Sequence, residues 1–110
     1  MLKRAAIIGL GIIGFSEAIH AGGSNGNVAT VMVHSGNAVI FDAGVHNQKP
    51  ACSIVGNHWA FSLTSEDGKA MYAMLLTAAA QNKKVSVYGT GLCSAWPDRE
   101  TPLYISIDYQ

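Results

Sequence analysis

The 110-residue sequence has little charge. Seven lysines and arginines balance seven aspartates and glutamates, and only 13% of the residues are charged. No run of basic residues occurs, so the chain has little with which to bind a nucleic-acid backbone or another polyanion. Proline is scarce, at three residues, whereas glycine is abundant, at twelve. Because 49% of the residues are hydrophobic, the composition favours one folded domain rich in strands and tight turns over a disordered chain.

A glycine-rich segment near the N-terminus, residues 9–14, reads GLGIIG and matches the spacing of a dinucleotide-binding loop. The surrounding sequence does not support that function. The glycine pair at 22–23 would interrupt the following helix within two turns, and His34 and Ser35 stand where an acidic ribose partner is expected. A chain of this length also cannot supply the second half of such a fold. We therefore interpret these glycines as small apolar residues of a targeting segment.

The first 21 residues have the three parts of a secretory signal peptide. A positive pair at 3–4 precedes an apolar run over 5–15, and the small residues Ala18 and Ala21 are candidate cleavage positions. We take Ala21, which leaves a glycine-rich start, although Ala18 also fits and an uncleaved membrane anchor remains an alternative. The sequence thus predicts a signal peptide over 1–21 and a single binding domain over 22–110. The expected location is secreted or periplasmic, with no membrane insertion after processing.

The mature chain has two cysteines, Cys52 and Cys93. An even cysteine count behind an export signal predicts a disulfide between them. On the chain-entropy model, closing a loop of about forty residues stabilises a small domain by roughly 4 kcal/mol. The alternative, a catalytic thiol at Cys93, requires a basic residue that the sequence does not identify.

Residue patterns predict a run of short elements. Apolar residues recur with helical spacing over 65–82, where Thr64 and Asp67 suggest the N-terminal cap and Lys83 and Lys84 follow the C-terminal end. Alternation predicts strands elsewhere and places Trp59 in the core. The expected segments are a flexible leader over 22–27, a hairpin of strands over 28–34 and 38–41, a third strand over 51–55, a half-buried extended segment over 58–63, and strands over 85–88 and 103–108.

The order of these segments is three strands, one helix and two strands. This order predicts a mainly β domain with one helix (α+β), an OB-fold-like five-stranded partly open barrel. An α+β sandwich with the helix on one face is the alternative.

Two stretches resemble the B subunits of pentameric bacterial AB-type toxins. Residues 51–53, 59–63 and 84–88 are similar to the cysteine-bearing strand, the Trp-x-x-Phe-like segment and the Val-rich strand of subtilase-cytotoxin and pertussis-like B subunits. Residues 93–102 resemble the Cys-x-Trp loop of cholera and heat-labile enterotoxin B subunits, with one extra residue between Cys and Trp. The match covers a little over half of the chain. The third-strand cysteine departs from the enterotoxin pattern, where its counterpart lies nearer the N-terminus.

This resemblance implies a secreted lectin-like subunit that forms a homopentamer, binds a host cell-surface glycan and delivers a catalytic A subunit. It implies that Trp96, Asp98 and Arg99 are the glycan-binding residues. An indole can stack on the apolar face of a sugar while a few polar groups bind its hydroxyls. The competing interpretation is that Trp96 is an aromatic lid over the barrel, with Asp98 and Arg99 in a solvated turn.

No catalytic pattern emerges from the sequence, so we predict that the protein is not an enzyme and has no cofactor. His34, His46 and His58 are spaced twelve residues apart without a cysteine or carboxylate partner at ligand spacing, which predicts no metal site. The alternative function is a stand-alone small secreted structural or inhibitory domain with no sugar site.

Overall fold

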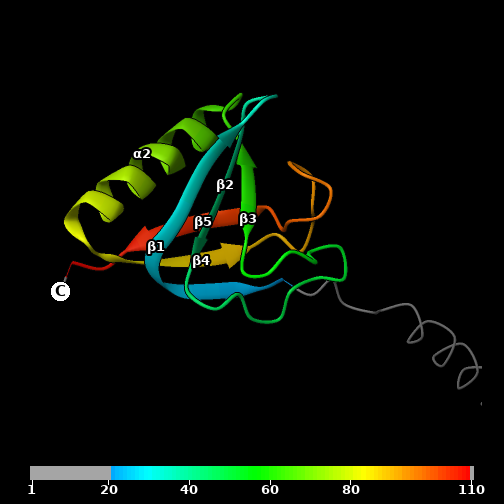
Figure 1. Ribbon diagram of the computed structural model, residues 1–110, viewed down its shortest axis with the longest axis horizontal. Helices are drawn as coiled ribbons and strands as arrows, with labels where there is room; N and C mark the ends of the chain where they lie inside the picture. Colours follow the sequence, from blue (N-terminus) through cyan, green and yellow to red (C-terminus); the bar gives the residue numbers. More distant parts are fainter. Residues whose placement is uncertain (1–20, 110) are drawn as a thin grey trace, which may run out of the picture.

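The computed structural model describes residues 21–109, so the predicted signal peptide lies outside the described residues except for Ala21. Figure 1 shows a curved sheet with one helix packed beside it. The elements are β1 (Gly23–His34), β2 (Ala38–Ala43), β3 (Trp59–Ser62), α2 (Glu66–Gln81), β4 (Lys84–Gly89) and β5 (Pro102–Ile107). The predicted class, mainly β with one helix after the third strand, is confirmed.

The five strands form one antiparallel sheet in the order β3-β2-β1-β4-β5. The long strand β1 pairs with β4 through Gly23–Asn27 and with β2 through Val28–His34, so it belongs to both halves of the sheet. At the far edges, a parallel bridge joins Trp59 to Glu100, where the N–H of Ala60 donates to the Glu100 carbonyl at 3.0 Å. The two edges of the open sheet therefore meet at one end.

The prediction of a flexible leader over 22–27 is wrong. Gly23–Asn27 is the half of β1 that pairs with β4. This pairing uses backbone groups and needs no apolar side chain. The same segment also passes close to the backbone of Gly44. A Cβ atom on Gly26 would lie 2.6 Å from the Cα atom of Gly44, so a side chain there would not fit. The glycines allow this close approach, and a pattern of apolar residues does not reveal it.

The third strand is also misplaced in the prediction, because residues 51–55 form turns and irregular structure. The N–H of Ser53 donates to the Pro50 carbonyl at 2.9 Å and closes a turn, and Ile54 is 72% exposed. The strand at this place in the order is β3, which lies within the segment predicted only as extended over 58–63.

Helix α2 confirms the helical prediction to within one residue at each end, but its cap differs. Ser65, not Thr64, is the N-cap, and its Oγ accepts from the N–H of Gly68 at 3.0 Å. Thr64 is instead hydrogen bonded to Ser62, with 2.7 Å between the two hydroxyl oxygens. At the other end, Asn82 adopts the left-handed conformation that ends many helices.

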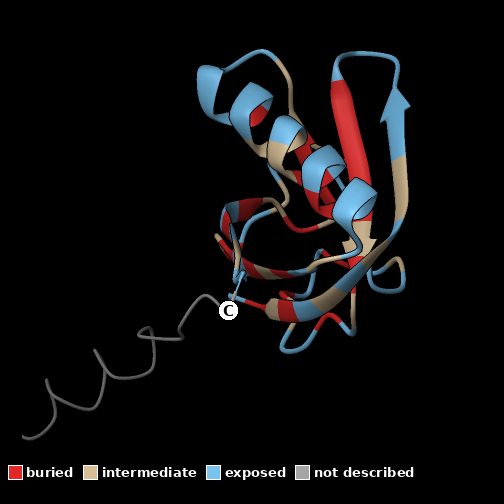
Figure 2. Ribbon diagram, turned by 90° about the vertical axis from the view of Figure 1, so that its left-hand side faces the viewer, coloured by how far each residue is buried: buried red, intermediate tan, exposed pale blue. Residues whose placement is uncertain are grey.

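The core lies between α2 and the inner face of the sheet. Figure 2 shows β2 buried along most of its length, whereas the outer side of α2 is exposed. Trp59 is fully buried, which confirms its predicted place in the core. The buried apolar side chains of this cluster are Val39, Phe41, Ala43, Trp59, Phe61, Leu75, Ala78, Val85, Val87 and Ile105.

Candidate functional site

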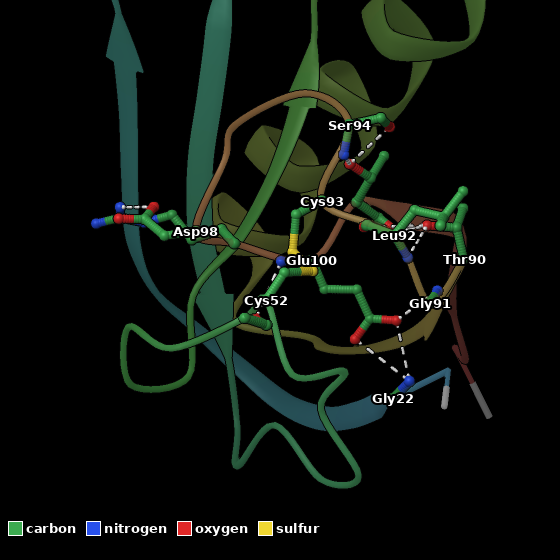
Figure 3. Close-up of a disulfide and its surroundings, with 12 residues drawn as sticks. Gly22, Cys52, Thr90, Gly91, Leu92, Cys93, Ser94, Asp98 and Glu100 are labelled. Atoms are coloured by element: carbon green, nitrogen blue, oxygen red, sulfur yellow. Dashed lines mark hydrogen bonds and ion pairs between the residues drawn. A yellow bond between two sulfur atoms is a disulfide. The ribbon is translucent and has the colours of Figure 1, made fainter. Parts of the chain in front are cut away.

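Cys52 and Cys93 form the predicted disulfide, with their Cα atoms 6.2 Å apart. Figure 3 shows the bridge joining the loop after β2 to the loop after β4. Neither cysteine is therefore available as a thiol nucleophile. The bridge anchors one end of the segment that contains the predicted glycan-binding residues, which we call the 94–99 loop.

The 94–99 loop contacts His34 at the end of β1 and His58 just before β3. The ring of Trp96 meets the ring of His34, at the end of β1, with 4.5 Å between centroids and 56° between planes. The Nε–H of Arg99 donates to Nδ1 of His58, just before β3, at 3.3 Å. The loop therefore contacts two separate segments of the chain.

Two small or apolar side chains on the outer face of the sheet are buried. Ile40 and Ala60 alternate with the core residues Phe41 and Trp59, so they point away from the core, yet they are only 2% and 0% exposed. Another segment must exclude water from them. The 94–99 loop contacts His34 and His58 on this side of the sheet, so we infer that it contributes to this cover.

Trp96, Asp98 and Arg99 lie together in one tight turn. The N–H of Arg99 donates to the Trp96 carbonyl at 3.3 Å, and Arg99 Nη1 lies 2.6 Å from Asp98 Oδ1. The Asp98 side chain is 39% exposed and that of Arg99 is 15% exposed, whereas Trp96 is half-buried. The turn thus places a half-buried indole beside a carboxylate and a guanidinium fixed against each other.

Two residues of this surface were not predicted as site residues, namely His34 and His58. They are brought to Trp96 and Arg99 by the fold, from positions about sixty and forty residues away in the chain. In OB-folds, ligands bind at the loops between strands 1 and 2 and between strands 4 and 5. His34 stands at the start of the first of these loops and Trp96 lies in the second, so the fold prediction was the signal that could have located His34.

A second group of polar residues lies inside the molecule, centred on Glu100, and we call it the Glu100 cluster. Glu100 is fully buried, and its carboxylate accepts from the N–H of Gly22 at 3.0 and 3.2 Å and from the N–H of Gly91 at 2.9 Å. Nε2 of His46 lies 2.7 Å from the same carboxylate. Figure 3 shows the two glycine contacts. The cluster joins the start of β1 to the loops after β2 and β4.

His46 also connects this cluster to the apolar core. Its ring stacks on Trp59 with 3.7 Å between centroids, and its Nδ1 lies 3.2 Å from the His58 carbonyl. Trp59 in turn donates from Nε1 to the Ser24 hydroxyl at 3.1 Å. Among residues 21–109, no buried side-chain nitrogen or oxygen lacks a hydrogen-bond partner. We therefore assign the Glu100 cluster a structural role.

The pKa of His46 is lowered, mainly because burial disfavours the charged imidazolium, and the hydrogen bond to Glu100 opposes this effect. The unfolded chain binds a proton at this histidine near pH 6.5, whereas the folded chain binds it only at lower pH. Unfolding therefore takes up a proton just below pH 6.5. We expect the free energy of unfolding, measured by urea denaturation, to fall as the pH is lowered from 7.5 through this window.

The matched variant for this pH effect is His46→Gln, which keeps a polar side chain but does not titrate. Its free energy of unfolding should vary less between pH 7.5 and 5.5 than that of the unchanged protein, although it starts from a lower value. An equal pH dependence in the two proteins would show that His46 is not the titrating group.

The sheet surface also carries an exposed aromatic pair away from the 94–99 loop. Tyr88 of β4 and Tyr104 of β5 are register partners, and their rings stack with 4.8 Å between centroids. They are 49% and 48% exposed. Beside them on the same strand, Ser86 accepts a hydrogen bond from the amide nitrogen of Asn25 at 2.6 Å. The sequence pattern did not indicate that these two tyrosines form a pair.

Within residues 21–109, no three side chains of the histidine, cysteine, aspartate or glutamate type gather where they could hold a metal ion. In the same part of the chain, no helix is both long enough and apolar enough to cross a membrane. No protein-family model matches the sequence, and neither a curated protein nor a solved structure does. Support for a function therefore comes from the residues and their geometry.

Proposed function

We propose that this chain is an exported carbohydrate-binding domain that binds a cell-surface glycan at Trp96, Asp98 and Arg99. The observation that carries the proposal is the half-buried Trp96, which lies against His34 beside the Asp98 and Arg99 ion pair. The disulfide supports export, because disulfides persist in oxidising compartments outside the cytosol.

The chemistry of this surface suits a sugar. A pyranose ring has an apolar face that packs on an indole, and its hydroxyls need a few fixed donors and acceptors. Asp98 supplies acceptor oxygens and Arg99 supplies donors, and their mutual contact at 2.6 Å holds both in place. The turn is anchored by the nearby Cys93 bridge, so little conformational entropy is lost when a ligand binds.

We further propose that several copies assemble as a ring, with five as the expected number, and that the ring carries a catalytic A subunit. A ring presents several weak sugar sites at once, which raises the affinity for a surface with many glycans. The structure offers a surface for a neighbouring copy. Leu103, at the start of β5, is 63% exposed beside Met71 and Met74 of α2, and together they line an apolar groove.

Replacing Trp96 by alanine tests the sugar site. We expect Trp96→Ala to weaken binding to the best ligand on a glycan array at least about tenfold, because the stacking surface is lost. Affinity would be measured by titration calorimetry with that glycan, and urea denaturation would confirm that the variant is folded.

The matched control is Tyr88→Ala, which removes an exposed aromatic ring that belongs neither to the 94–99 loop nor to the lining of the apolar groove. Its glycan affinity should equal that of the unchanged protein. If Tyr88→Ala loses binding and Trp96→Ala keeps it, the sugar site is at the tyrosine pair and our assignment is wrong. Light scattering on the same samples measures the mass of the assembly, and a monomer would contradict the ring.

The second candidate function is a stand-alone structural or inhibitory domain without a sugar site. The burial of Ile40 and Ala60 favours it, because Trp96 would then serve as part of the cover over this face. This function predicts a monomer that binds no glycan. The only effect of Trp96→Ala would then be a lower free energy of unfolding.

A further inference from the structure

The backbone of Gly22 and Gly23 attaches the start of the described chain to the core. The Gly22 carbonyl accepts from the N–H of Gly89 at 2.9 Å, and Gly23 exchanges two backbone hydrogen bonds with Asn47. Gly22 is buried and Ala21 is exposed. The position of the Gly22 nitrogen is thus fixed by contacts of Gly22 and Gly23 with residues that follow them in the chain.

Both carboxylate oxygens of Glu100 point at this nitrogen. The distances from the Gly22 nitrogen to Oε1 and Oε2 are 3.2 and 3.0 Å, and Figure 3 shows the two contacts. No side chain fits at Gly22, because a Cβ atom there would lie 2.7 Å from Glu100 Oε1 and 2.9 Å from His46 Nε2. The site therefore accepts only a glycine, either as the first residue of a chain or within a chain.

The carboxylate lacks a permanent counter-charge. Among residues 21–109, the one basic side chain within ion-pair distance of Glu100 is His46, which lies at 2.7 Å. Burial disfavours the charged form of this histidine. No lysine or arginine of this part of the chain reaches the carboxylate. A buried carboxylate is costly unless it is paired with an opposite charge.

We propose that the chain is processed between Ala21 and Gly22, and that the new ammonium group of Gly22 forms a buried ion pair with Glu100. The proposal deepens the proposed export, on which it rests. An endopeptidase that cuts after small residues would hydrolyse the bond from the Ala21 carbonyl carbon to the Gly22 nitrogen. Water supplies the hydroxyl of the new Ala21 carboxyl group and a proton for the amine, which is protonated at neutral pH. Since Gly22 is buried once the chain folds, cleavage precedes folding.

Mass spectrometry of the exported protein tests the position of the cut. We expect a chain that begins at Gly22, with its disulfide intact. A chain that begins at Ile19, or one that is not cleaved, would overturn the proposal. The glycan experiment is independent of this result, so loss of the proposed sugar function with an N-terminus at Gly22 leaves the proposal standing.

A double-mutant cycle tests the ion pair itself. One form of the protein begins at Gly22 and the other keeps Ala21, and each carries either Glu100 or Glu100→Gln. With Glu100, the free Gly22 amine should lower the unfolding equilibrium constant about tenfold or more, which favours the folded state, as expected for a charge-assisted hydrogen bond. With Glu100→Gln, this difference should fall to about twofold or less. If all four proteins fold and the effect of the free Gly22 amine on stability is the same with Glu100 as with Glu100→Gln, no ion pair forms.

Discussion

Replacing both Cys52 and Cys93 by alanine is expected to lower the free energy of unfolding by about 4 kcal/mol. The disulfide closes a loop with a sequence separation of 41 residues, and removing it restores the conformational freedom of that loop in the unfolded chain. A domain of this size has a small core, so such a loss is a large part of its total stability. Urea denaturation of the disulfide-bonded protein and of the variant measures the difference.

Two controls separate the bridge from the side chains. Each single alanine variant should lose about as much stability as the double variant, because the bridge needs both sulfurs. Reducing the unchanged protein with a dithiol should give the same loss without any substitution. If the free energies of unfolding of the reduced and oxidised proteins differ by less than about 1 kcal/mol, loop closure is not what stabilises this fold.

The sequence predicted the elements in which apolar residues recur at a regular spacing, and it missed the elements that lack such a spacing. Helix α2 has apolar residues at Met71, Met74, Leu75 and Ala78, and the pattern located it within one residue at each end. The half of β1 before Val28 has no apolar period, because its pairing with β4 depends on glycine and asparagine backbone. The pair Ile54 and Val55 looks like a strand, but a turn at Pro50 holds it outside the sheet.

The same contrast applies to the candidate site. Trp96, Asp98 and Arg99 are neighbours in the sequence, so a local pattern could propose them as a set. The contacts of His34 and His58 with the 94–99 loop arise from the fold. The Glu100 cluster is the extreme case, because Gly22 and His46 lie 78 and 54 residues from Glu100. No spacing rule connects such distant residues, and a buried glutamate resembles any surface glutamate in the sequence.

Truncating Glu100 to alanine is the second large effect that we expect. The substitution removes the acceptor of the Gly22 and Gly91 N–H groups and the partner of His46, and it leaves these groups buried. Unpaired buried polar groups are costly, and removing one partner of a buried pair typically costs about 3–5 kcal/mol. We therefore expect Glu100→Ala to lower the free energy of unfolding by about that amount in urea denaturation, or to prevent folding.

The matched control is Glu66→Ala, which truncates the same side chain where it is 92% exposed and 3.5 Å from Lys69. Surface ion pairs of this kind contribute little, so this variant should stay within about 0.5 kcal/mol of the unchanged protein. Comparable losses at Glu100 and Glu66 would mean that the Glu100 cluster does not stabilise the fold. A large loss at Glu100 alone would show that the buried contacts of this carboxylate with the start of β1, with His46 and with the loop after β4 stabilise the fold.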